Sequence, residues 1–293
     1  MFKRQSVGDI IFEIIIYIVI CCIILIIAYP LIFVISASLS NPEFVMQGRV
    51  RLLPQGFTIQ AYHRVFENER IWNGYINTIK YTLVGTSVNM VMTIFGAYPL
   101  SRKDFVGRKF FIMVFIFTMF FSGGMLPKYL LIQKLGLLNN FWVMIIPEAV
   151  VTWNLILMKT FFQSIPSEIQ EAALIDGCTN FGILFKIILP LSAPILAVIG
   201  LFYAVGHWNA YFNALIYLSD QSMYPLQLVV REILNQEHMN EMLLDIESIR
   251  EQQLLAETLK YAVIIISSIP MLVIYPFVQG FFKKGIMLGA IKG

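Results

Sequence analysis

Six stretches of this sequence are apolar enough and long enough to cross a lipid bilayer as helices. A membrane-crossing α-helix needs about 20 consecutive, mostly apolar residues. The chain offers such stretches at about residues 10–38, 76–100, 109–127, 141–162, 182–206 and 259–282. Only 13% of the residues are charged and 58% are hydrophobic, whereas soluble domains are about 25% charged. We therefore predict an all-α integral membrane protein with six transmembrane helices.

The third and fourth of these stretches are the least regular. Gly123, Gly124 and Pro127 interrupt the third, and Pro147 interrupts the fourth. Such residues are tolerated inside membrane helices where neighbouring groups satisfy the freed backbone. We expect the broken spans to line a path through the protein.

The distribution of basic residues predicts the orientation of the chain. The first apolar stretch follows Lys3 and Arg4 and is too long for a cleaved signal sequence, so we predict a retained span. Lys and Arg are enriched on the cytoplasmic side. With the N-terminus inside, the inner segments and their flanks carry 11 of the 21 Lys and Arg residues. The outer segments are about twice as long as the inner segments and carry the other 10. We predict that both termini are cytoplasmic.

Composition argues against several other classes. The formal net charge of +3 gives no reason to expect a nucleic-acid partner. The cysteines (Cys21, Cys22 and Cys178) and the histidines (His63, His207 and His238) are too few and too scattered for a disulfide framework or a metal site. We therefore expect no metal and no catalytic residues.

The predicted outer segments are long for connectors. Residues 39–75 contain turn signals such as Asn41-Pro42, and residues 207–258 begin with aromatic side chains and end in an amphipathic stretch from 235 to 257. Most connections are only about 4–6 residues long. These segments either contact an external partner or cap the membrane domain.

A short predicted inner segment has the pattern of a surface helix. Ser167 can cap its N-terminus, and Glu168 suits its first turn. Glu171, Ala172, Ala173, Leu174 and Asp176 follow, and Gly177 ends the helix at a position that often has a left-handed backbone. Thr179 or Asn180 can start the next helix, and Pro190 marks its entry into the membrane. The small residues allow close approach by another protein.

This segment resembles the EAA loop of permease subunits of ATP-binding-cassette (ABC) importers. The family pattern is Glu-Ala-Ala, three residues, Gly, nine residues, Ile, one residue, Leu-Pro, and Glu171 to Pro190 match each fixed position. Cys178 stands where Ala is common, and Glu148 where a small neutral residue is expected.

The resemblance covers nearly the whole chain and points to the carbohydrate branch of the family. Asn77-Thr78 opens the second span, and Trp208-Asn209 follows the fifth, as in sugar permeases. The C-terminal residues from Lys284 resemble the MalG-like branch. Residues 121–127 and 259–262 resemble its LplC-like group, which is associated with complex oligosaccharides.

The resemblance implies a type I importer permease fold. It divides the chain into an N-terminal helix and external loop (1–75), a permease domain (76–282) with the EAA loop at about 163–190, and a cytoplasmic tail (283–293). The helix from Glu171 to Gly177 would dock on an ATPase subunit. In the tail, Gly289, Lys292 and Gly293 would contact the ATPase dimer.

The resemblance also implies the partners of the chain in the bacterial inner membrane. They are a second permease subunit of different sequence, two ATP-binding subunits with ATP and Mg, and a solute-binding protein that delivers an oligosaccharide. The chain has no G-x-x-x-x-G-K-[ST] phosphate loop, so we expect no ATP hydrolysis by this chain and no cofactor of its own.

Several polar and aromatic residues in or near the spans are candidates for the substrate path. They are Glu148, Trp153, Asn154, Tyr203, Trp208, Asn209 and Tyr211. Trp and Tyr near span ends are also typical of the interfacial belt or of packing. Asn154 should face the interior, either bonding another helix or lining the path. Glu148 either contacts substrate, or it lies at a wet cavity mouth or pairs with a basic residue such as Lys128.

Two other functional classes remain as alternatives. A membrane-embedded enzyme would need paired acidic, His or nucleophilic residues in its spans, and Glu148 stands nearly alone. An ion-coupled carrier usually has more spans in inverted repeats, and no repeat is visible. A permease for another solute class also fits the pattern.

Overall fold

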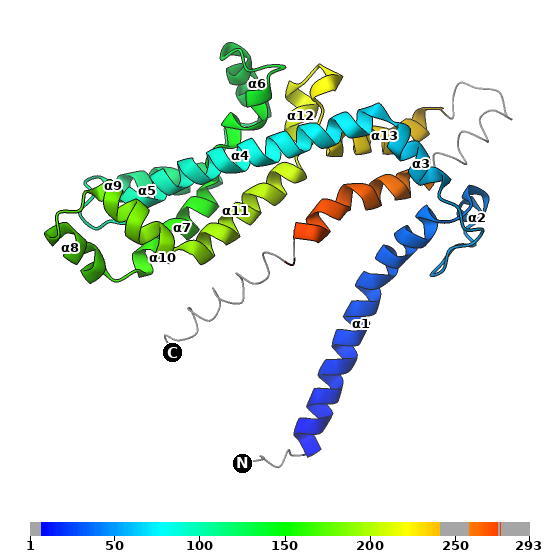
Figure 1. The fold of residues 1–293 in the computed structure, drawn as a ribbon, viewed down its shortest axis with the longest axis horizontal. Coiled ribbons are helices and arrows are strands. Elements are labelled where there is room, and N and C mark those ends of the chain that lie inside the picture. Colours follow the sequence, from blue (N-terminus) through cyan, green and yellow to red (C-terminus); the bar gives the residue numbers. More distant parts are fainter. Residues whose placement is uncertain (1–6, 241–257, 275, 277–293) are drawn as a thin grey trace. The chain divides into compact units, whose positions relative to one another are not determined.

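The computed structural model describes residues 7–240, 258–274 and 276, and every regular element among them is helical (Figure 1). These residues form two compact units. The first comprises residues up to Glu69 together with Val230–Ser268, and the second comprises Arg70–Val229 and the residues from Ile269. Each unit is described by itself.

The first unit contains the longest apolar helix. Its elements are α1 (Val7–Ser38), α2 (Pro42–Met46) and α3 (Gln60–Glu67). The most apolar window of α1 has a mean hydropathy of 3.4, and none of it is buried within the protein. A helix that is apolar on all sides needs lipid around it. At its end, the Ser36 hydroxyl donates to the Leu52 carbonyl oxygen at 2.7 Å, which fastens the following loop.

The second unit contains α4 and the shorter helices that pack on it. Its elements are α4 (Glu69–Ser101), α5 (Arg108–Phe120), α6 (Met125–Lys134), η1 (Phe141–Met144), η2 (Ile146–Glu148), α7 (Thr152–Ser164), α8 (Ser167–Ile175), α9 (Asn180–Ile183), η3 (Leu184–Ile188), α10 (Leu189–Leu191), α11 (Ala193–Trp208), α12 (Phe212–Tyr217) and η4 (Gln221–Met223). Helix α13 (Leu226–Asn240) begins here, and its later residues belong to the first unit. It covers the start of the predicted amphipathic stretch, while residues 241–257 lie outside the described part.

Three of the predicted spans are broken helices. The segments α5 and α6 meet at 116°, Phe141–Glu148 and α7 at 52°, and Asn180–Leu191 and α11 at 83°. Gly124 separates the first pair with φ +85°, a backbone that favours glycine. The breaks in the third and fourth spans therefore fall where the sequence predicted them.

The break in the fifth span lies at Ser192 and was not predicted. Pro190 and Pro194 flank it, and neither residue has an N–H to continue the helical ladder. The preceding turn, η3, is a π-helix, an irregularity that is frequent at functional sites. The two prolines and the widened turn together account for the bend.

Length and composition support up to five spans among the described residues. Two helices qualify on their own, and each bent pair adds one. The helix Thr258–Ile274 is apolar but shorter, and most of residues 275–282 lie outside the described part. The sixth span therefore stays a prediction.

Two apolar clusters form the core of the second unit. One contains Met158, Phe162, Ala173, Ile183 and Tyr203. The other gathers side chains from residues 132–145 and 214–228 around Tyr81. Figure 1 shows α6 and α12 standing beside each other, and their Tyr129 and Tyr217 rings stack at 6.1 Å.

The Asn77-Thr78 pair fastens the second cluster to α4. The Asn77 side-chain amide donates to the carbonyl oxygens of Ser222 and Tyr224, at 2.6 and 3.1 Å. The Thr78 hydroxyl accepts from the Leu226 N–H at 2.8 Å. Each bond satisfies a backbone group of the connection between α12 and α13. These two residues thus have a structural role.

Close approach of α4 and α11 requires a glycine. A Cβ atom at Gly85 would lie only 2.4 Å from Nε2 of His207. The His207 ring is 8% exposed, and its Nε2 lies 2.6 Å from the Asn89 Oδ1 atom. The absence of a side chain at Gly85 therefore makes room for this buried hydrogen bond.

We predict that Gly85→Ala is less stable than Gly200→Ala by about 1–3 kcal/mol, because the methyl group added at Gly85 displaces His207. Both substitutions gain about 1 kcal/mol in helix propensity, so this gain cancels in the comparison. Thermal unfolding of the purified complexes measures the difference. Gly200→Ala is the matched control, since its Cβ would meet only Met90 Sδ at 3.8 Å. Equal melting temperatures for the two variants would contradict the prediction.

Candidate functional site

Helix α8 ends in a well-formed C-cap. The Cys178 N–H donates to the Ala173 carbonyl oxygen at 2.9 Å, and the Gly177 N–H donates to that of Leu174 at 3.0 Å. Gly177 has φ +81°, as predicted for a left-handed residue. This bond pair is the Schellman motif. It fixes the direction in which the chain leaves the helix.

The start of α8 differs from the sequence-based expectation. Ser167 is the first residue of the helix rather than its cap, and Pro166 occupies the cap position without a side-chain hydrogen bond. A residue with helical backbone angles cannot place its hydroxyl on the N–H groups of the first turn as a cap does. The next helix does start as predicted, because the Thr179 hydroxyl accepts from the Gly182 N–H.

The two sides of α8 differ in exposure. Ala173 is 7% exposed and packs into the first apolar cluster. Glu171, Ala172 and Asp176 are exposed, and Leu174 and Ile175 expose 44% and 86% of their surface. Large apolar side chains exposed together mark interaction surfaces. Helix α8 therefore has a fixed inner side and a free outer side that combines acidic and apolar groups.

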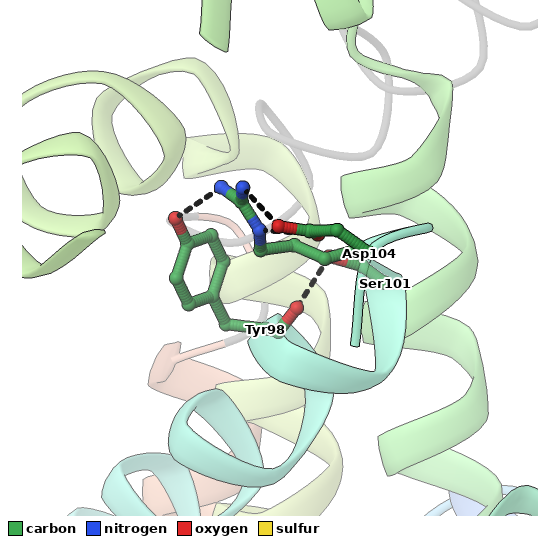
Figure 2. A network of polar contacts seen from close by, with 4 residues as sticks. Tyr98, Ser101 and Asp104 are labelled. Atoms are coloured by element: carbon green, nitrogen blue, oxygen red, sulfur yellow. Dashed lines mark hydrogen bonds and ion pairs between the residues drawn. The ribbon is translucent and has the colours of Figure 1, made fainter. Parts of the chain in front are cut away.

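The loop between α4 and α5 lies next to α8 and has its own polar network. Figure 2 shows the Asp104 carboxylate and the Tyr98 hydroxyl directed at the guanidinium that lies between them. That guanidinium belongs to Arg102, whose Nη2 donates to Asp104 at 2.7 Å and whose Nη1 donates to the Tyr98 hydroxyl at 3.4 Å. The Ser101 hydroxyl donates to the Tyr98 carbonyl oxygen at 2.6 Å.

Hydrogen bonding within this network perturbs the pKa values of both charged groups. Donation from Arg102 holds the pKa of the Asp104 carboxyl below its usual range, and the same bond raises the pKa of Arg102. Both groups are therefore ionised at neutral pH. Because the Asp104 side chain is 67% exposed, the pair contributes little stability, and its effect is to order the loop.

A groove of about 350 Å³ separates this loop from α8. Arg102, Asp104, Gln170 and Glu171 are among its lining residues. The Gln163 amide donates to the Ser101 carbonyl oxygen at 3.3 Å across its floor. Charged groups of both signs and exposed apolar side chains thus share one surface at this end of the unit.

A second polar cluster lies where the fourth span is broken. The Asn89 amide donates to the Glu148 carbonyl oxygen at 2.6 Å, and its Oδ1 faces His207. The Glu148 Oε1 atom accepts from the Asn213 amide at 2.9 Å and lies 3.9 Å from Lys128 Nζ. Glu148 therefore lines a cavity and is paired with Lys128, and its contact with substrate stays a prediction.

Tyr203 braces the same break from α11. Its hydroxyl accepts from the Val151 N–H at 3.1 Å and lies 2.7 Å from the buried Thr93 hydroxyl. The Tyr203 side chain is 4% exposed. It satisfies a backbone group that the broken helix leaves without an intrahelical partner.

The other path candidates lie at different depths. Asn154 is 5% exposed, which confirms that it faces the interior, whereas Trp153 is 57% exposed. Trp208 is 4% exposed and packs edge-on against Tyr75 at 6.1 Å. Asn209 and Tyr211 are exposed. Of the predicted path residues, Glu148 and Tyr203 belong to the cluster at the break. The predicted tail contacts Gly289, Lys292 and Gly293 lie outside the described residues.

Sequence reasoning missed several members of the cluster at the break. Asn89, Thr93, His207 and Asn213 were not identified as candidates. Asn89 carried the same signal as Asn154, an amide in the middle of an apolar stretch. His207 and Asn213 lie at span ends, where polar residues are common, so only the three-dimensional structure distinguishes them.

Nearly the whole chain matches one family. Residues 2–288 match the binding-protein-dependent transport system inner membrane component family. The chain belongs to this family and is a permease component of an ABC importer, not an enzyme.

Relatives and a solved structure support this assignment over nearly the full length. The polygalacturonan/rhamnogalacturonan transport system permease protein YtcP of Bacillus subtilis is 42% identical, over 96% of this chain and 98% of that protein. Protein LplC of the same organism is 38% identical, over 90% and 89%. A crystal structure of a bacterial ABC transporter involved in the import of the acidic polysaccharide alginate contains a chain that is 36% identical, with a TM-score of 0.86, covering 96% of this chain and 99% of that one.

We predict that Tyr203→Phe destabilises the complex by about 1–3 kcal/mol, because the Val151 N–H then loses its acceptor in an apolar environment. Tyr129→Phe is the matched control, since no hydrogen bond to the Tyr129 hydroxyl is seen within the described residues. Thermal unfolding of the two purified variants gives the difference. If Tyr203→Phe unfolds no earlier than Tyr129→Phe, the Tyr203 hydroxyl does not brace the break.

Proposed function

We propose that this chain is one of two permease subunits of an importer in which helix α8 transmits ATP-driven motion to the membrane spans. The observation that carries the proposal is the geometry of α8. Ala173 anchors it in the core of the second unit, while Glu171, Leu174 and Ile175 lie on its free side. A helix fixed on one side and free on the other can pass a push from a partner to the spans.

The partner of α8 in this proposal is a separate ATP-binding subunit. Two such subunits bind ATP and Mg, and their closure moves the two permease subunits. The groove beside α8 contributes Arg102, Asp104 and Glu171 to the docking surface. Polar groups at such a surface give orientation and specificity more than affinity.

The substrate in this proposal is an oligosaccharide derived from a polysaccharide. Two relatives with at least 36% identity belong to a polygalacturonan/rhamnogalacturonan transport system and to a transporter involved in the import of alginate. An external solute-binding protein delivers the sugar, which the family description supports by its term binding-protein-dependent. The second permease subunit in this proposal is a different chain.

The membrane arrangement in this proposal has six spans and both termini in the cytoplasm. The helix Thr258–Ile274 begins the sixth span. This orientation places α8 on the cytoplasmic side, where ATP-binding subunits are available. Gly289, Lys292 and Gly293 then contact the ATPase dimer, and residues 207–258 contact the solute-binding protein.

The substrate path in this proposal follows the broken spans. Irregular backbone within a membrane is tolerated where it is buried in protein or lines a water-filled cavity. Glu148 lies at such a break and is exposed to a cavity. The remaining path residues are Trp153, Asn154, Tyr203, Trp208, Asn209 and Tyr211, of which Asn154, Tyr203 and Trp208 support the path wall from within the protein.

We predict that Glu171→Lys and Gly177→Val each abolish sugar-stimulated ATP hydrolysis while the complex still assembles. The first reverses the charge on the docking side of α8. The second forces a β-branched residue into a left-handed backbone, at a cost of about 1–2 kcal/mol, and so redirects the chain that leaves α8. ATPase assays on the reconstituted complex measure both effects.

Gly136→Val is the matched control for backbone strain. Gly136 has φ +66° with open space around it, as Gly177 does, but it follows α6 instead of α8. The control should keep coupled hydrolysis. Coupled hydrolysis at the wild-type rate by Glu171→Lys and Gly177→Val would show that α8 does not transmit the motion.

A further inference from the structure

A cavity of about 610 Å³ lies between α6, α12 and the broken fourth span. Its lining includes Lys128, Glu148, Phe212 and Asn213, together with the backbone of the Gly123-Gly124 pair. All of these residues belong to the second unit. The volume lies within the range of about 300–1,000 Å³ that is typical of small-molecule sites.

The polar groups of this cavity have unused hydrogen-bonding capacity. The Lys128 Nζ atom is 3.9 Å from Glu148 Oε1, too far for a hydrogen bond. Asn213 also bonds to Oε1, and no partner of Oε2 is seen within the described part of the chain. An ammonium group offers three donors and a carboxylate about four acceptor sites. Both donors and acceptors are therefore available to a ligand.

An apolar surface lies beside these charges. The Phe212 side chain is 52% exposed and lines the cavity, as do Leu131 and Pro127. A pyranose ring presents hydroxyl groups at its edge and C–H groups on its faces, so it needs polar groups and an apolar surface side by side. Lys128, Glu148 and Phe212 provide this combination in one cavity.

We propose that this cavity is a subsite for one sugar ring of the transported oligosaccharide, in which Glu148 accepts from two ring hydroxyls and Lys128 and Asn213 donate to ring oxygens. This inference rests on the proposed function and assigns the subsite to residues of this chain. The ligand inserts next to the 3.9 Å pair and completes the hydrogen bonds that the pair leaves open.

The charge balance of the subsite defines what it recognises. Lys128 and Glu148 compensate each other, and both are partly exposed, at 42% and 55%. For a sugar carboxylate in this cavity, the electrostatic attraction to Lys128 is about as large as the repulsion from Glu148. The subsite therefore recognises hydroxyl groups and does not discriminate between acidic and neutral sugar rings.

The test uses the complete reconstituted transporter with its solute-binding protein. The probes are trigalacturonate and its carboxyl-reduced counterpart, and the readouts are uptake and stimulated ATPase activity. Lys128→Met and Glu148→Gln should each lower uptake by about tenfold or more, measured with the probe that the wild type transports. This is the loss expected for one charge-assisted hydrogen bond. Lys134→Met is the matched control, because Lys134 is an exposed residue of α6 outside the cavity.

A charge-exchanged variant separates ligand binding from a structural ion pair. Lys128→Glu combined with Glu148→Lys keeps the pair but exchanges donor and acceptor positions. If the cavity is a subsite, the double variant should still fail to take up the probe, while the thermal stability of the double variant returns to the wild-type value. Recovery of uptake in the double variant would show that the pair is only structural and would overturn the proposal.

A labelling experiment gives a readout that does not depend on transport. Ser122 lines the cavity and is exposed, so Ser122→Cys in a background with Cys21, Cys22 and Cys178 replaced by Ser should react with a soluble maleimide. The transported probe should slow this reaction severalfold. If the site is unreactive without sugar, lipid or another subunit covers it, and the subsite is excluded.

The outcomes distinguish this inference from the proposed function. If sugar-loaded binding protein fails to stimulate the wild-type complex, the oligosaccharide function itself is wrong. If the wild type is active and Lys128→Met and Glu148→Gln transport like Lys134→Met, the function stands and the subsite is wrong. Loss in both variants, with protection of Ser122→Cys by sugar, supports the subsite.

Discussion

The break in the fourth span imposes a constraint that much of the second unit satisfies. Backbone N–H and C=O groups freed within a membrane must find partners inside the protein, since lipid offers none. Asn89 donates to the Glu148 carbonyl oxygen, and Tyr203 accepts from the Val151 N–H. These partners come from α4 and α11, so the break can exist only where both helices are packed against it. Gly85 allows that packing by leaving room for His207.

A cavity lies next to the break in the fourth span. A continuous helix satisfies most of its backbone groups internally. At the broken span, the Glu148 side chain lines the cavity. The end of the second unit that carries α8 is organised in another way than the break. There, a Schellman C-cap and the Arg102–Asp104 pair order exposed segments. The second unit thus combines an exposed helix that is anchored at Ala173 with an interior whose polar groups are held in place by hydrogen bonds.

The family match covers residues 2–288, and the 36% identical chain of the alginate transporter superposes with a TM-score of 0.86. Such similarity over 96% of the chain establishes the class of protein. The structure adds that Lys128, Glu148 and Phe212 lie in one cavity, which makes them candidates for sugar contacts.

The sequence by itself determined the class of protein and, for the part of the chain that the structure describes, the helical fold and two of the three breaks. Long apolar stretches, Gly124 and Pro147 act locally, so their effects can be predicted without knowing the neighbours. The left-handed backbone of Gly177 was predictable for the same reason. Only the tertiary structure decided that Asn89, His207 and Asn213 gather around Glu148, because hydrogen bonds between residues 59 to 118 positions apart depend on how the helices pack. It also decided that Ser167 is not a cap, since that depends on where the preceding Pro166 directs the chain.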